Sequence, residues 1–145
     1  MSSVDFYFED VDPIPFQEKI LILHLNYLIK NELGKTGEIS VIFCSDDYLL
    51  KMNKDYLNHD YYTDIITFDY VEGNTISGDL FISLDRVKEN ANMYNIPVIN
   101  ELCRVVFHGT LHLVGYKDKT EVEQKLMREK EDYYLGKVDF KEMKL

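Results

Sequence analysis

The chain has 145 residues and a formal net charge of −10, from 16 basic and 26 acidic side chains. This acidic balance argues against indiscriminate binding to nucleic acid, because such binding depends on neutralising phosphates with lysine and arginine. No apolar run is long enough to cross a bilayer, and the acidic start of the chain is unlike a signal peptide. We therefore expect one cytoplasmic domain, residues 1–145, in which Cys44 and Cys103 are buried thiols rather than a disulfide.

The first half of the chain alternates between strand and helix patterns. Hydrophobic periodicity predicts these elements at residues 4–8 (strand), 16–33 (helix), 38–44 (strand) and 46–56 (helix). Gly34 and Gly37 follow the first helix, and glycine commonly ends a helix. Ser45 stands directly before the second helix, where a serine caps the free backbone N–H groups of the first turn. The order predicts a strand-to-helix unit.

The second half of the chain begins with a predicted hairpin and continues as helices. Strand patterns at residues 64–70 and 76–84 are joined by a turn at Gly73 and Asn74. Three helices are expected next: one from Ser83 or Asp85 to about residue 95, one that begins at Pro97, and one from Thr120 to Gly136. Together the patterns predict an α+β fold, a small mixed sheet covered by helices.

The stretch FHGTLHLVGYKD, residues 107–118, carries the strongest signal in the sequence. His108 and His112 stand four residues apart in a helix-periodic run, so their imidazoles share one helix face. Gly115 can take a positive φ that ends the helix and turns the chain back, which makes Asp118 the candidate third ligand. Two helical histidines and one group from the following turn form a zinc site with an open fourth position. We therefore predict one zinc ion per chain in a catalytic site.

The residues around the two histidines narrow the chemistry of this site. Helical zinc peptidases carry a glutamate directly after the first histidine, where it acts as the general base. Here that position is Gly109, which disfavours a peptidase. Three basic residues make the neighbourhood of the expected metal more basic than the chain average, namely Arg104, Lys117 and Lys119. The two lysines are equally well explained as solvated loop charges.

Three segments, in the same order as in a known family, support a metal-dependent activity. HGTLHLVGY, the upstream MNKDYLNHDYYTDIITFDY and SGDLFIS resemble the YbeY-type ribosomal RNA maturation factors over about residues 38–120. That family is described as metal-dependent endoribonucleases specific for single strands. The resemblance implies that His108 and His112 bind zinc, and it places Asp118 where the family usually has a third histidine. A carboxylate oxygen binds zinc at distances similar to those of a histidine nitrogen, so we expect the metal to persist.

Other positions of the family pattern indicate residues that lie near the expected site, and at one position this chain departs from the pattern. The family has an arginine after the tyrosine that matches Tyr56, and the resemblance implies that this arginine contacts RNA; here the residue is Leu57. His59 stands where the family can have a lysine, and it is a candidate proton-transfer group or a turn histidine that faces water. Asp79 matches the acid of the family's Gly-Asp pair, and it is a candidate catalytic carboxylate near the metal or an acid that terminates a turn hydrogen bond.

The metal motif predicts metal-assisted hydrolysis, and the resemblance implies a zinc-dependent endoribonuclease specific for single-stranded RNA. The resemblance also implies a role in rRNA maturation and in ribosome assembly and quality control. Lys117, Lys119 and Arg104 are the expected RNA contacts. A ribosomal subunit or ribosomal protein is the expected docking partner, and no membrane is involved. The alternative is a non-catalytic ribosome-assembly factor in which zinc only stabilises the fold. The absence of an arginine at Leu57 favours that alternative.

Overall fold

The computed structural model describes residues 2–59 and 61–144. Its four-stranded sheet is built from β1 (Ser3–Phe8), β2 (Lys35–Cys44), β3 (Ile65–Asp69) and β4 (Thr75–Ser83). The helices of the described ranges are α1 (Glu18–Asn31), α2 (Asp46–Leu57), α3 (Leu84–Met93), α4 (Val98–Leu113), α5 (Glu121–Leu135) and α6 (Phe140–Met143). None of these helices is long and apolar enough to span a bilayer.

The sheet is mixed, and its strand order is β1-β2-β4-β3. β1 and β4 both run parallel to β2, whereas β3 pairs with β4 in the antiparallel direction. β3 and β4 form the predicted hairpin, and Gly73 in its connection has a φ of 59°. The predicted α+β fold with a small mixed sheet is therefore confirmed.

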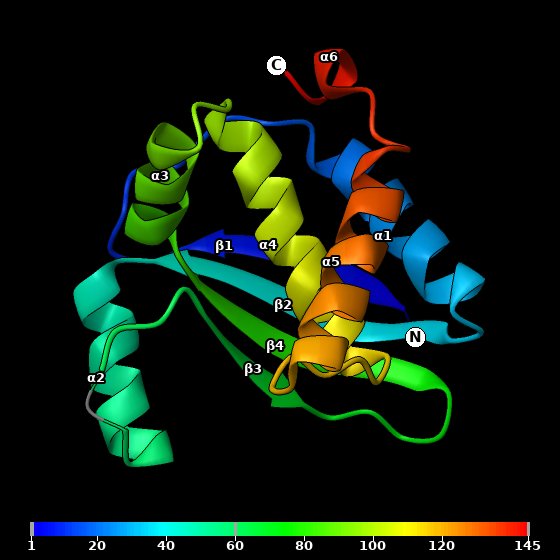
Figure 1. Cartoon of the computed structure of the whole chain (residues 1–145), viewed down its shortest axis with the longest axis horizontal. Coiled ribbons are helices and arrows are strands. Elements are labelled where there is room, and N and C mark those ends of the chain that lie inside the picture. The colour runs from blue at the N-terminus through cyan, green and yellow to red at the C-terminus, as the bar shows by residue number, and fades with distance from the viewer. Residues whose placement is uncertain (1, 60, 145) are drawn as a thin grey trace.

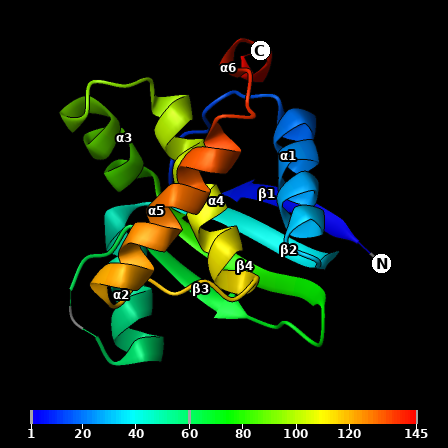
Figure 2. The same ribbon diagram turned by 45° about the vertical axis from the view of Figure 1, so that its right-hand side comes forward.

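Helices cover the two faces of the sheet unequally. α4 lies across one face, with α1 and α5 beside it (Figures 1 and 2). The main core forms here, from alternate residues of β2 and β4 and the apolar sides of α1 and α4, and its fully buried members include Val41, Phe43, Leu80, Ile82, Leu25, Phe107 and Leu111. On the opposite face α2 covers a smaller cluster centred on Leu49, Cys44 and Ile66. The metal motif thus lies on a helix whose apolar side is fixed against the sheet.

Three of the predicted helix starts are confirmed by side-chain caps. Ser45 accepts a hydrogen bond from the backbone N–H of Tyr48 at the start of α2, and Ser83 does the same for α3. Thr120 and Glu123 form a reciprocal capping box at the start of α5. Each cap satisfies backbone N–H groups that have no partner within the helix, so these boundaries are fixed by local sequence.

The end of the first helix differs from the prediction. α1 ends at Asn31, and Leu33 rather than a glycine takes the left-handed conformation, with a φ of 68°. The N–H of Gly34 then bonds the carbonyl of Ile29, and β2 begins at the next residue. Gly37 lies inside β2, because this strand begins at Lys35, earlier than predicted. The pairing of β2 with β4 is irregular between Thr36 and Ile39. The short helix α6 was not predicted, since four residues are too few to show a helical period.

Both cysteines are buried free thiols, as the sequence predicted. Cys44 lies beneath α2 and Cys103 lies within α4. Burial raises the pKa of each thiol to about 12, so both remain protonated at neutral pH. They act as small apolar side chains of the core.

Gly78 of β4 allows the end of α4 to pack closely on the sheet. A Cβ atom at this position would lie 2.6 Å from the backbone oxygen of Phe68 and 2.7 Å from a methyl group of Leu113. The backbone of the neighbouring strand cannot yield as a side chain can. Because Gly78 has no side chain, Leu113 can pack directly against β4. This contact sets the distance between the sheet and the last turn of α4.

We expect Gly78→Ala to destabilise the protein by about 1–3 kcal/mol, because the added methyl group overpacks a rigid contact. Urea unfolding followed by circular dichroism measures this change. Gly136→Ala is the matched control, because Gly136 has a helical φ of −64° and a Cβ atom there would come no closer than 3.3 Å to its nearest neighbour, the carbonyl oxygen of Asp132. An unfolding midpoint for Gly78→Ala equal to or above that of the control would show that this contact does not constrain α4.

Candidate metal centre

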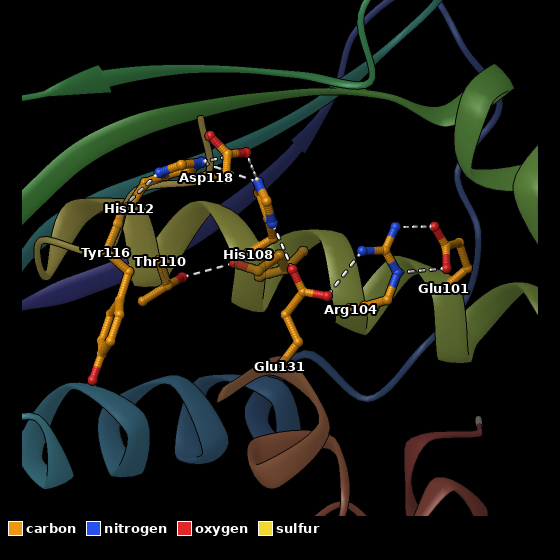
Figure 3. A network of polar contacts seen from close by, with 9 residues as sticks. Glu101, Arg104, His108, Thr110, His112, Tyr116, Asp118 and Glu131 are labelled. Carbon is orange, nitrogen blue, oxygen red and sulfur yellow. Dashed lines mark hydrogen bonds and ion pairs between the residues drawn. The ribbon is translucent and has the colours of Figure 1, made fainter. Parts of the chain in front are cut away.

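The structure brings together the three side chains proposed as metal ligands. His108 and His112 lie one turn apart near the end of α4, and their Nε2 atoms are 3.0 Å apart. The Oδ2 atom of Asp118 lies 3.2 Å from Nε2 of His108 and 3.4 Å from Nε2 of His112 (Figure 3). In the described part of the chain, this is the group of His, Cys, Asp or Glu side chains placed to hold a metal ion.

The turn after α4 carries the third group back over the helix. Gly115 has a φ of 115°, the positive value that the sequence predicted at this position. Its N–H bonds the carbonyl of His112, and the N–H of Tyr116 bonds the carbonyl of Leu111, which closes the helix end. The chain can then reverse, so that Asp118 faces both imidazoles.

The other nitrogen of each imidazole determines where its hydrogen lies. Nδ1 of His108 is 2.5 Å from a carboxylate oxygen of Glu131, and Nδ1 of His112 is 2.9 Å from the backbone oxygen of Tyr116. Because both partners are acceptors, each Nδ1 donates and each neutral ring presents a lone pair at Nε2. Two lone pairs and the Asp118 carboxylate then face one another, an arrangement that a shared metal ion would stabilise.

The distances within this group also fit a bound metal ion. Ligands of a tetrahedral ion bound at about 2.0 Å lie about 3.3 Å from one another. The three separations observed here are 3.0, 3.2 and 3.4 Å. Two nitrogens and one oxygen on one side of the ion leave its remaining side open to the solvent. The residues present therefore fit a catalytic metal ion with a free coordination position.

A buried chain of charged groups supports His108 from behind. Glu131 accepts from Nδ1 of His108 and, at 3.0 Å, from Nη1 of Arg104 (Figure 3). Arg104 also makes two hydrogen bonds to Glu101, which is fully buried. Burial opposes the charged form of Glu131, but His108 and Arg104 outweigh it, so the pKa of this carboxyl is lowered. Glu131 is thus held as an anion that orients the ring.

The same buried charged groups also change the proton affinity of His108. Burial by itself disfavours the charged imidazole, but the hydrogen bond and charge of Glu131, together with Asp118, raise the pKa of His108 above its ordinary value. The site therefore favours positive charge at the point where the three candidate ligand atoms meet. A metal ion supplies that charge without protonating the ligand.

A second anchor holds the backbone that orients His112. The Tyr116 hydroxyl donates to Glu32 at 2.6 Å, and the Tyr134 hydroxyl donates to the other oxygen of the same carboxylate. Glu32 follows α1, whereas Tyr134 belongs to α5, so two helices fix the residue whose carbonyl accepts from Nδ1 of His112. No short motif indicates this arrangement, because Glu32 is 84 residues from Tyr116 and 102 residues from Tyr134.

An open cleft of about 620 Å³ lies in front of the candidate metal centre. Its walls are the end of α2, the segment that leads into β3, and the turn after α4. His59 and Lys117, both predicted from sequence, line this cleft, and so does Leu57. The His59 ring stacks on Tyr61, whose hydroxyl lies 2.8 Å from Nδ1. Lys119 is exposed but is not part of the cleft wall.

The structure does not bring Asp79 to this cleft. Leu80 and Ile82 point into the core beneath α4, so the alternation of β4 directs Asp79 to the opposite face of the sheet. There it accepts a hydrogen bond from the Tyr70 hydroxyl at 3.2 Å and borders a hollow with Phe81 and other residues under α2. The expectation that Asp79 lies near the metal is corrected by strand geometry.

Arg104 also has a different place from the one expected. Its side chain is 21% exposed, and its guanidinium is bonded to both Glu101 and Glu131. These two carboxylates raise the pKa of Arg104 against the effect of burial. Arg104 therefore fixes Glu131 behind His108 and is not available as a free cation for RNA. Glu131 could not be predicted from the sequence, because it belongs to α5 and no short motif connects α5 with α4.

We expect Glu131→Gln to raise the dissociation constant for the metal about 10- to 100-fold, because a neutral amide orients His108 less firmly and lowers its basicity. Competition with a chromogenic chelator measures the affinity. Glu129→Gln, an exposed change on the same helix, is the control. Unchanged metal affinity in a Glu131→Gln protein with normal thermal unfolding would contradict this role.

The chain is similar to several known proteins. A family model described as Endoribonuclease YbeY matches residues 13–139. A protein of that name from Cytophaga hutchinsonii is 51% identical over 135 residues, covering 92% of this chain and 94% of the relative. One from Christiangramia forsetii is 57% identical over 104 residues, covering 72% and 73%. The solution structure of TM1509 from Thermotoga maritima matches with a TM-score of 0.65 at 29% identity, covering 92% and 87% of the two chains. The chain belongs to the Endoribonuclease YbeY family.

Proposed function

We propose that this protein is a zinc-dependent endoribonuclease that hydrolyses phosphodiester bonds of single-stranded RNA. The observation that carries the proposal is the convergence of His108, His112 and Asp118 at the side of an open cleft. The family supports RNA as the substrate, since the relatives are named endoribonucleases. Two imidazole nitrogens and a carboxylate are a common ligand set for zinc, which supports zinc as the ion.

The residues of the chain have distinct roles in this reaction. Zinc bound by the three ligands would lower the pKa of a coordinated water toward 7 and polarise a phosphoryl oxygen. Glu131 and the Tyr116 carbonyl hold the two imidazoles in the tautomer that offers Nε2. His59 borders the cleft with Nδ1 next to Tyr61, so its Nε2 is the atom placed to carry a proton.

The charge of the cleft supports a substrate delivered by a partner. Lys117 is the lysine in its wall, whereas Asp64 and Asp69 add negative charge near the path of the RNA. Together with the net charge of −10, this predicts weak affinity for free RNA. A ribosomal subunit or ribosomal protein would then hold the ribosomal RNA in place during rRNA maturation, and affinity would come from that docking.

A non-catalytic role in ribosome assembly is the alternative function. Leu57, which lines the cleft, favours it, because leucine cannot bind a phosphate. In that case zinc would stabilise the end of α4 and the protein would bind RNA without cutting it. The open side of the three-ligand site favours the enzyme, since structural zinc sites are closed by four protein ligands.

The enzyme is tested by zinc content and cleavage together. We expect one zinc per chain and slow cutting of a single-stranded RNA that stops with chelator and resumes with zinc. His108→Ala and His112→Ala should lose both the metal and the activity. Asp118→Ala should weaken zinc binding, whereas Asp118→His should retain it, because either ligand suits the position.

A base-paired RNA of the same sequence is the control substrate, and it should remain uncut. Binding of RNA or ribosomal particles that survives the histidine substitutions, without any cleavage sensitive to chelator, would instead establish the assembly factor. Full zinc content in both histidine variants would show that the metal is bound elsewhere.

We expect Leu57→Arg to strengthen RNA binding, because the new guanidinium would face the cleft, where Leu57 is 40% exposed. The slope of log affinity against log salt should steepen by about 0.7 for one added phosphate contact on a single strand. Fluorescence anisotropy with a labelled oligonucleotide measures both quantities. Leu23→Arg on α1 is the control for the change in net charge. Equal slopes for the two variants would remove position 57 from the RNA path.

A further inference from the structure

The candidate metal ligands border two hollows, one on each side. His108 and Asp118 line the large cleft described above, and both also line a smaller hollow of about 240 Å³. This second hollow lies between α4 and α5, and Arg104, Gln124 and Arg128 form much of its wall. An RNA strand that passes from the cleft across the candidate metal centre can therefore continue into the smaller hollow, next to Arg104 and Arg128.

Arg128 differs from the other two arginines of the chain in its partners. Arg86 is paired with Asp46 at 3.1 Å, and Arg104 is paired with Glu101 and Glu131. Arg128 is exposed on α5, and it makes no hydrogen bond or ion pair with any residue in the described ranges. A guanidinium that borders the metal ligands and has no carboxylate partner is free to bind an anion.

We propose that this smaller hollow binds a backbone phosphate of the RNA next to the phosphate that is cleaved, and that Arg128 makes the contact. The inference rests on the proposed endoribonuclease function, because it assigns a further part of the same substrate. The planar guanidinium can donate two parallel hydrogen bonds to the phosphate oxygens. The Gln124 amide in the same wall can donate one more.

The composition of the hollow indicates a phosphate rather than a base. Apart from the imidazole of His108, its wall has no aromatic side chain on which a base could stack, and its exposed polar groups on α5 are the Arg128 guanidinium and the Gln124 amide. The carboxylates of Asp118 and Glu131 also line the hollow, but Asp118 faces the two imidazoles, and Glu131 is bonded to His108 and Arg104. The large cleft is more acidic, since Asp64 and Asp69 line it beside a single lysine, Lys117, and position 57 is leucine. Arg128 therefore supplies, from the other side of the candidate ligands, the guanidinium that the cleft wall lacks.

The test measures the affinity of the zinc-loaded protein for a labelled single-stranded RNA as a function of salt. Arg128→Gln should weaken binding at low salt and make the salt slope shallower by about 0.7, the amount expected for one lost contact to a single strand. Arg128→Lys should keep part of the affinity, because lysine retains the positive charge but cannot donate two parallel hydrogen bonds from a planar group. Lys125→Gln is the matched control: it removes one positive charge from the same helix outside the hollow.

A chemical change in the RNA locates the contact. Replacing single phosphates near the cleaved bond by neutral methylphosphonates should reveal one position at which the wild type loses affinity and Arg128→Gln loses nothing further. Additive losses at every position, or an Arg128→Gln slope equal to that of Lys125→Gln, would overturn the assignment while leaving the endoribonuclease intact. A wild-type protein that neither binds nor cuts RNA would overturn both.

Discussion

The structure of the site depends on one electrostatic constraint, the meeting of three acceptor atoms at the end of a helix. Nε2 of His108, Nε2 of His112 and Oδ2 of Asp118 lie within 3.4 Å of one another, and each ring has its hydrogen on the far nitrogen. In these tautomers the three acceptor atoms repel one another, and a bound metal ion would stabilise the same geometry. The turn at Gly115 and the anchored Tyr116 both serve to hold this arrangement.

The buried charged groups behind the site explain why the His108 ring is held in one orientation. Glu101 and Glu131 are buried, and an unpaired carboxylate at such depth is strongly disfavoured. Arg104 joins the two, and His108 completes the set of partners for Glu131. Each member therefore satisfies another, and loss of one leaves a buried charge without its partner. A network of this kind gives orientation to a ligand more than it gives stability to the fold.

The distribution of charge also relates the site to its substrate. The chain carries a net charge of −10, and the cleft in front of the ligands contains carboxylates of its own. Free cations are therefore placed locally, with Lys117 on the cleft side and Arg128 on the other side of the ligands. A protein with this charge gains little from long-range attraction to RNA, so short local contacts matter more for its affinity.

The sequence by itself determined the features that depend on neighbours along the chain. The spacing of His108 and His112, and the turn that returns Asp118, follow from helix periodicity and a glycine, and the order of strands and helices follows from hydrophobic patterns. Only the tertiary structure decided that Glu131 lies behind His108 and that Asp79 faces away from the metal centre. The physical reason is that the packing of helices on one another and on the sheet is not encoded in local spacing. This packing brings α5 against α4, and it decides which face of β4 meets the helix that carries the candidate ligands.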